Sequence, residues 1–330
     1  MKIAVVGLGA VGGLMAAKLA RAGHAVSALA RGATLASVRE HGVRLTMAGA
    51  QTASAITASD DAKALGPQDL VIVALKGQSL AAAAQTMQPL LGPNTLVMPA
   101  MNGVPWWFLQ TASASAGLGD RSLPSIDPDG RVKALLPLER VLGCVVHLTC
   151  SSPAPGVIRH GFGDRLIVGE PGGGASPRAD AVCAALAQAG FKSESSADIR
   201  HDIWFKLWGN MTMNPVSALT GAATDHILDD PLVHAFILRT MEEAAQIGAR
   251  IGCPITQSGE ERMALTRQLG GFKTSMLQDA EAGRAIELNA LVAAVHEIGM
   301  RLSVPMPNIG ALLGLTRLMA RERGLYPPAA

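Results

Sequence analysis

The stretch KIAVVGLGAVGG, Lys2–Gly13, decides the fold prediction for this chain. Its first five residues, Lys2–Val6, form a short apolar run rich in β-branched residues, which is typical of a strand buried on both faces. A GxGxxG pattern follows, and the alanine-rich Leu14–Arg21 then predicts a helix. Glycines in this pattern allow a tight turn, the approach of a pyrophosphate and close helix–strand packing, and the helix start offers free N–H groups to the phosphates. The pattern predicts a dinucleotide-binding turn made of Gly7, Leu8, Gly9, Ala10, Val11 and Gly12.

Strands and helices continue to alternate after this turn. The predicted strands and β signals lie at His24–Arg31, Leu70–Leu75, Thr95–Pro99, Leu166–Val168 and Phe191. Such alternation favours a parallel sheet with right-handed crossovers. We therefore expect an α/β chain whose N-terminal domain, residues 1–197, is a Rossmann-type doubly wound parallel sheet. An irregular segment at about 111–140, rich in Ser, Gly, Pro and Asp, is expected to be a functional loop or a family-specific insertion.

From Asp198 onward the sequence shows helical periodicity and no strand signal. The predicted helices are Ile199–Asn214, Pro231–Ile251, Ser258–Leu269, Thr274–Ala282, Ala285–Arg301 and Asn308–Arg323. We therefore expect residues 198–330 to form an all-helical domain that carries the substrate-binding and catalytic groups.

Composition excludes several classes of protein. With 49% hydrophobic and 16% charged residues, the chain can bury enough surface to fold. The net charge is +2 and no basic run occurs, which argues against a nucleic-acid partner. Glycines interrupt the apolar N-terminus and no apolar stretch reaches about 18 residues, so we expect neither a signal peptide nor a membrane span. The four cysteines are scattered along the sequence and indicate neither disulfides nor a metal site, which is typical of a reducing compartment. Together these observations predict a cytoplasmic protein that binds small molecules. A homodimer is compatible with them.

The residues that follow the predicted strands indicate which cofactor binds. NAD enzymes place an acid at the end of the second strand, whereas this chain has Arg31 there, and a guanidinium suits the 2′-phosphate of NADP. The alternative is an ordinary surface arginine. Lys76 can reach a phosphate or a substrate carboxylate, and Asn102-Gly103 can contact the nicotinamide ribose or the substrate. Asn-Gly is also a plain turn signal, but its place at the end of a strand favours function.

A polar stripe crosses the apolar helix predicted after Asp198. Lys206, Asn210 and Asn214 fall at i, i+4 and i+8, so they share one face and need polar partners. Pro215 is expected to bias Asn214 away from helical geometry. A lysine in this setting can act as a general acid, and the alternative is a solvated face of an amphipathic helix.

Two later residues are further candidates. Ser275 begins a predicted helix, and Glu287 is placed in the first turn of the next one among apolar neighbours. The helix dipole alone can explain a glutamate there, and a role in binding a ligand or in an ion pair is the alternative.

Taken together, these motifs resemble the ketopantoate reductase (2-dehydropantoate 2-reductase) family over nearly the whole chain. The elements that carry the resemblance are GLGAVGG at Gly7–Gly13, Arg31, Leu75-Lys76, Asn102-Gly103, Lys206 with Asn210 and Asn214-Pro215, Ser275–Asp279, and Glu287.

The resemblance implies reduction of ketopantoate to pantoate by NADPH in pantothenate and coenzyme A synthesis. It implies that Lys206 protonates the carbonyl oxygen and that Glu287 accepts a hydrogen bond from the substrate hydroxyl. The residues implied to line the substrate pocket are Asn102, Asn210, Asn214 and Ser275. Those implied to hold NADPH are the glycine-rich turn, Arg31, Lys76 and Asn102.

Two departures from compact family members leave the substrate open. Phe272 stands where those members carry an asparagine, and the segment from Trp106-Trp107 to about residue 140 is longer. One alternative is therefore a related NADP-dependent dehydrogenase for another branched 2-oxo or 2-hydroxy acid. An alternative of a different class is a non-catalytic NADP-binding regulatory protein.

Overall fold

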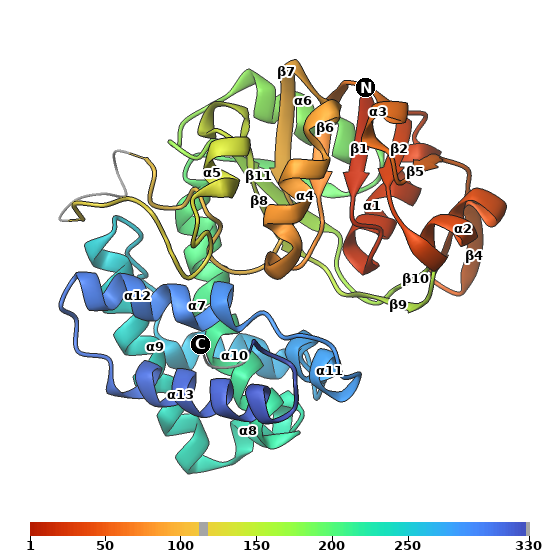
Figure 1. The fold of residues 1–330 in the computed structure, drawn as a ribbon. Coiled ribbons are helices and arrows are strands. Elements are labelled where there is room, and N and C mark those ends of the chain that lie inside the picture. Colours follow the sequence, from red (N-terminus) through yellow and green to blue (C-terminus); the bar gives the residue numbers. More distant parts are fainter. Residues whose placement is uncertain (112–117, 328–330) are drawn as a thin grey trace. The chain divides into compact units, whose positions relative to one another are not determined.

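A computed structural model describes residues 1–111 and 118–327, and the chain divides into two compact units. The first unit contains residues 1–101 and 129–202, and the second contains 102–128 and 203–330. Each unit is described by itself below, and both are drawn in Figure 1.

A parallel sheet organises the first unit, as the sequence predicted. Its described strands run in the order β5-β2-β1-β6-β7. Their bounds are β1 Lys2–Val6, β2 Ala25–Leu29, β5 Thr57–Ser59, β6 Gln68–Val73 and β7 Leu91–Pro99. Val6 at the end of β1 pairs in register with Leu29 of β2 and Val73 of β6, so the strands end at one edge. The strand order reverses between β1 and β6, which is where ligands bind in sheets of this kind.

Helices and short 3₁₀ turns connect these strands. Helix α1, Ala10–Arg21, buries Leu14, Met15 and Leu19 in the same apolar core as Ile3 and Val5 of β1. The remaining helices of this unit are α2 Gly32–His41, α3 Ala62–Leu65, α4 Leu80–Thr86, α5 Arg131–Leu135 and α6 Pro177–Gln188, with 3₁₀ turns η1 Gly77–Ser79, η2 Gln88–Leu90 and η4 Leu138–Arg140.

Two smaller sheets extend the first unit and were largely missed by sequence reasoning. One has the order β4-β3-β10-β9 and the other β12-β11-β8, as far as the described residues show. Their strands are β3 Val43–Met47, β4 Ala50–Ser54, β8 Gly143–His147, β9 Cys150–Ala154, β10 Val157–His160, β11 Arg165–Gly169 and β12 Lys192–Ser196. Strands β3 and β10 pair with each other although they lie more than a hundred residues apart in the sequence, so local sequence patterns cannot predict their pairing. Ile158 of β10 packs against Gly13, where any Cβ would overlap it.

The regular elements that the structure describes in the second unit are all helices, as predicted, while its residues 102–111 and 118–128 form turns and loops. Its helices are α7 Ile199–Thr220 (whose first turn groups with the first unit), α8 Thr224–Asp229, α9 Pro231–Arg250, α10 Gly259–Gln268, α11 Ser275–Glu281, the π-helical turn η5 Asn289–Ala293, α12 Ala294–Arg301 and α13 Pro307–Glu322. None of the helices in the described parts of the chain is long and apolar enough to span a membrane.

The expected irregular segment is only partly irregular. Residues 112–117 lie outside the described residues, while α5 covers 131–135 and η4 covers 138–140. Residues 118–128 pack on α12, because the Arg301 guanidinium donates to the carbonyl of Ser122 at 2.7 Å and Glu297 accepts from the amide of Ser125 at 2.9 Å. This part of the segment is therefore anchored to the second unit.

One local expectation was wrong. Pro215 was expected to take Asn214 out of the helix, but α7 continues through Pro215 to Thr220. Proline inside a helix removes one hydrogen bond and costs about 3 kcal/mol. Burial of the flanking residues Met213 and Val216 offsets that cost, since tertiary packing outweighs local propensity here.

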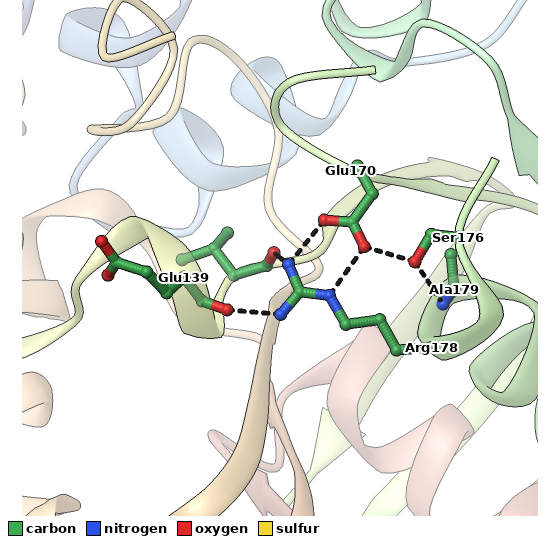
Figure 2. A network of polar contacts seen from close by, with 6 residues as sticks. Glu139, Glu170, Ser176, Arg178 and Ala179 are labelled. Carbon is green, nitrogen blue, oxygen red and sulfur yellow. Dashed lines mark hydrogen bonds and ion pairs between the residues drawn. The ribbon is translucent and has the colours of Figure 1, made fainter. Parts of the chain in front are cut away.

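A polar network joins separate segments of the first unit (Figure 2). Glu170, one residue after β11, accepts hydrogen bonds from the guanidinium of Arg178 on α6, with a 2.6 Å contact to Nε. Arg178 also donates to the carbonyl of Glu139, and Ser176 donates to Glu170. The hydrogen bond from Arg178 is the main cause that holds the pKa of Glu170 below its ordinary value. The network therefore fixes the start of α6 against η4.

This network predicts a pH-dependent contribution to stability. Replacing Glu170 with Gln leaves Arg178 without its anion and should lower the free energy of unfolding at pH 7 by about 1 kcal/mol. Because the pKa of Glu170 is lowered in the fold, its contribution is complete above about pH 4.5, the ordinary pKa of glutamate, and is lost as pH falls through the lowered value.

Denaturant unfolding of wild type and Glu170→Gln between pH 7 and pH 3 checks this prediction. The difference between the two proteins should shrink toward low pH. Glu194→Gln, which breaks an exposed ion pair with Arg165, is the matched control and should change stability less. A constant difference across the whole range would contradict the assigned role of Glu170.

Candidate functional site

The glycine-rich turn contains two kinds of glycine. Gly7 has φ +97°, and a Cβ there would lie 2.7 Å from the carbonyl oxygen of Ala74. A Cβ at Gly12 would overlap the carbonyl oxygen of Gly7 and lie 2.9 Å from the Cβ of Ala74. Packing within the protein therefore explains Gly7 and Gly12.

Packing does not explain Gly9. A Cβ at Gly9 would have no described atom within 4 Å, and Gly9 caps α1 with no side-chain hydrogen bond. The start of α1 therefore presents backbone N–H groups beside open space, which is the arrangement that binds phosphate. Leu8, Ala10 and Val11 complete this turn between β1 and the first turn of α1.

Two basic residues of the first unit follow the neighbouring strands. Lys76 lies three residues after β6 and is half-buried, and the same loop contributes Ala74 and Leu75 to the packing around Gly7. Arg31 follows β2, caps α2 and is exposed. Its guanidinium makes no hydrogen bond or ion pair with any residue that the structure describes, so it is available to an external anion.

In the second unit, Lys206 on α7 meets Asn102. The Nζ atom of Lys206 donates a hydrogen bond of 2.8 Å to Oδ1 of Asn102, a pair that is part-buried and 104 residues apart in sequence. The sequence placed both residues in one site, and the structure joins them directly. Asn102 follows the last residue of β7 by three positions.

The turn at Asn102-Gly103 also packs against the segment that contains Glu287. Gly103 has φ +86°, a Cβ there would lie 2.6 Å from the backbone carbon of Ala290, and the amide of Val104 donates to the carbonyl of Ala290 at 2.8 Å. Glu287 is half-buried and lies three residues before Ala290. The unit therefore gathers Asn102, Lys206 and the segment of Glu287 in one region.

The local structure around Glu287 differs from the prediction. A helix was expected from Ala285, but Glu287 precedes the helical turns, and its carbonyl accepts from the amide of Leu291 at 3.3 Å. The next residues form the π-helical turn η5, a feature often found at functional sites. The C-terminal segment holds this region, because Tyr326 donates to the side chain of Asn289 and Leu325 accepts from the amide of Ile286 at 3.0 Å. Sequence reasoning missed Tyr326, since its partner is a non-local asparagine.

For the other predicted pocket residues, the structure gives positions along helices α7 and α11. Asn210 and Asn214 follow Lys206 along α7, and Asn214 is only 7% exposed. Neither amide makes a hydrogen bond to another described residue, so both are available to a ligand. Ser275 is exposed at the first residue of α11, after the cap Thr274, and no hydrogen bond joins its side chain to another residue in the described parts.

Aromatic packing fixes the rotation of α7. The Trp204 indole fills the space where a Cβ of Gly248 on α9 would lie, and Phe108 stacks on Trp204 with ring centroids 5.9 Å apart. Trp208 donates to the carbonyl of Met241 on α9 at 2.7 Å. Trp106 and Trp107, whose role the sequence left open, are both buried. These contacts decide which face of α7 carries Lys206.

Comparisons with known proteins identify the class. The family models "Ketopantoate reductase PanE/ApbA" and "Ketopantoate reductase PanE/ApbA C terminal" match residues 3–111 and 198–320. A 2-dehydropantoate 2-reductase from Mesorhizobium japonicum is 41% identical over 99% of this chain and 100% of its own length.

Solved structures are similar over nearly the whole chain. A Ralstonia solanacearum MolK2 protein assigned to the ketopantoate reductases has a TM-score of 0.95 at 57% identity, covering 98% of this chain and 99% of that one. A ternary structure of D-mandelate dehydrogenase with NADH and anilino(oxo)acetate has a TM-score of 0.85 at 20% identity, covering 98% and 100%, and shows the fold alone.

The fold and these relatives define an oxidoreductase built on a Rossmann-type sheet. The chain belongs to the ketopantoate reductase family, which confirms the resemblance seen in the sequence.

The two kinds of glycine predict different costs of substitution. Gly12→Ala forces its new methyl group into the Gly7 carbonyl and should lower the free energy of unfolding by about 2–3 kcal/mol. Gly9→Ala enters open space, and the exchange of the cap residue should cost at most about 1 kcal/mol. Thermal unfolding of the two variants checks this ranking, and equal losses would refute it.

Proposed function

We propose that this chain is a cytoplasmic, NADPH-dependent 2-oxo-acid reductase that converts 2-dehydropantoate to pantoate in pantothenate and coenzyme A synthesis. The observation that carries the proposal is the 2.8 Å hydrogen bond between Lys206 and Asn102, beside the segment of Glu287. The Mesorhizobium japonicum relative, a 2-dehydropantoate 2-reductase at 41% identity, supports the choice of substrate.

Several features of the chain support the proposal that it binds NADPH. The open space at Gly9 and the uncapped start of α1 suit the pyrophosphate. Arg31, exposed at the end of β2, suits the 2′-phosphate, and Lys76 and Asn102 are proposed to contact the remainder of the cofactor. When bound, NADPH supplies the hydride that reaches the carbonyl carbon of the substrate.

Lys206 is proposed to act as the general acid. The carbonyl oxygen gains negative charge during the reduction, and an ammonium in hydrogen-bond reach can give it a proton. Asn102 orients the Nζ atom through the oxygen of a neutral amide. A carboxylate at this position would stabilise the ammonium and make it a weaker acid, and the amide avoids that effect.

The other polar groups of the second unit are proposed to hold the substrate. Glu287 accepts a hydrogen bond from the hydroxyl of the substrate, and Asn210, Asn214 and Ser275 line the pocket. The side-chain amide of Asn214 makes no hydrogen bond to another described residue although the residue is only 7% exposed, and this supports the role, because the amide can both donate to and accept from a ligand.

A second candidate substrate is another branched 2-oxo acid. The side chain of Phe272, a residue that is 38% exposed, offers a substrate no hydrogen bond, and the fold is shared with D-mandelate dehydrogenase. Initial rates with a panel of 2-oxo acids, each measured with NADPH and with NADH, test the function. The highest kcat/KM should belong to 2-dehydropantoate with NADPH. Tight NADPH binding without oxidation by any 2-oxo acid would instead support a regulatory protein.

Removing the proposed acid gives a direct prediction. Lys206→Ala should lower kcat by about 100- to 10,000-fold, because the carbonyl oxygen loses its proton donor, while the NADPH dissociation constant stays nearly the same. Stopped-flow turnover and fluorescence titration measure the two quantities. Lys273→Ala, which removes an exposed partner of Glu281, is the control. Undiminished turnover in Lys206→Ala would refute the assignment.

Cofactor choice gives another prediction. Arg31→Asp should weaken NADPH binding by about 10- to 150-fold, since a charge-assisted hydrogen bond is lost and a like charge faces the phosphate. NADH binding should persist, because a carboxylate at this position can accept from a ribose hydroxyl. Equilibrium titrations with both cofactors measure this selectivity, and an unchanged NADPH affinity would show that Arg31 has another role.

A further inference from the structure

A second cation lies beside the polar stripe of α7. Arg262 on α10 places its guanidinium carbon 5.7 Å from the ring centroid of Phe205, and a Cβ at Gly209 would lie 2.9 Å from one of its terminal nitrogens. Phe205 and Gly209 are one turn apart on α7, and Gly209 follows Lys206 by three residues. Residues at this spacing are neighbours on a helix surface. The guanidinium therefore covers the part of α7 next to Lys206.

No described residue supplies an anion to this guanidinium. Its Nε atom is buried without a hydrogen-bond partner, and no described residue forms an ion pair or a side-chain hydrogen bond with Arg262. The acids of its own helix are engaged elsewhere, Glu260 with His234 and Glu261 with Ser258. Burial lowers the pKa of Arg262 below its ordinary value, because no nearby carboxylate compensates the lost solvation.

The sequence of α7 accommodates this side chain. Glycine inside a helix is about 1 kcal/mol less favourable than alanine, yet position 209 is a glycine in the middle of α7. The Arg262 side chain occupies the space beside this glycine, since a methyl group there would lie 3.0 Å from Nε and 2.9 Å from a terminal nitrogen. A half-buried guanidinium, with its Nε atom buried and unpaired, therefore lies over the glycine of α7.

We propose that Arg262 binds the carboxylate of the substrate, and so makes this site selective for 2-oxo acids over neutral carbonyl compounds. The inference rests on the proposed function, because it assigns a partner to the part of the substrate that Lys206 does not protonate. In a 2-oxo acid the carboxylate carbon is bonded directly to the carbonyl carbon. The group that binds the carboxylate must therefore lie next to the acid that serves the carbonyl, as Arg262 does across Gly209. A guanidinium binds a carboxylate with two parallel hydrogen bonds.

The test compares a 2-oxo acid with its neutral primary amide in wild type and in Arg262→Met. With 2-dehydropantoate, kcat/KM should fall by about 10- to 150-fold, mainly through KM, because a charge-assisted interaction is removed. With the amide of the same acid, kcat/KM should not change. Arg262→Lys should recover part of the loss, since it restores the charge without the bidentate geometry.

Stability and cofactor binding separate this role from a structural one. Arg262→Met removes a half-buried charge that has no ion-pair partner among the described residues, so its melting temperature should stay at or above that of wild type. Arg267→Met, on the same helix but paired with Asp229 at the surface, should leave both substrates unaffected. Gly209→Ala, which displaces the guanidinium with little change to α7, should reduce the preference for acid over amide in the same direction.

Three outcomes would overturn the inference while leaving the proposed function intact. These are an equal loss for acid and amide in Arg262→Met, an unchanged kcat/KM for the acid, or a weakened NADPH affinity, which would assign the guanidinium to a cofactor phosphate. A wild-type protein that reduces no 2-oxo acid would overturn the proposed function, and the inference with it.

Discussion

The rotation of α7 about its own axis is the constraint on which the helical unit depends. Trp204 can reach its buried position only because residue 248 of α9 is a glycine, and Trp208 is held by a hydrogen bond to Met241 on the same helix. With these two side chains fixed, Lys206 is directed to the side where Asn102 accepts its hydrogen bond. A rotation of α7 would bury a charged group and expose two indoles, and both changes are unfavourable.

Close backbone approach plays the equivalent part in the first unit. The carbonyl of Gly7 and the Cβ of Ala74 occupy the space that a side chain at position 12 would need. Because Gly12 has no side chain, the turn after β1, the start of helix α1 and the loop after β6 can pack closely together. Gly9 is not required by this packing. The same motif therefore serves two purposes: two of its glycines build the fold, and the third leaves room for a ligand.

The sequence predicted features that arise from local patterns, namely four of the strands of the central sheet, the long helices of the second unit and the polar stripe on α7. It did not predict the short edge strand β5 or helices such as α6 and α8. It did not predict the sheet that joins β3 to β10, whose short and partly polar strands pair across more than a hundred residues. It also misjudged Pro215, because burial on α7 outweighs the local preference of proline. In the candidate site, Lys206 and Asn102 stood out by position, whereas the sequence analysis did not single out Arg262, which lies among several charged residues in the segment Ser258–Leu269. Two structural features distinguish Arg262 from the other charged residues of α10: its guanidinium lies over Gly209, and no described carboxylate pairs with it.

The central claim is that a neutral amide holds Lys206 in position as a proton donor. The pH dependence of kcat/KM in Asn102→Asp tests it most directly, because this change puts a carboxylate where the amide oxygen lies 2.8 Å from Nζ. A nearby negative charge raises the pKa of a lysine, so the loss of activity at alkaline pH should move to higher pH than in wild type. An alkaline limb at the same pH in both proteins would show that Lys206 is not the proton donor.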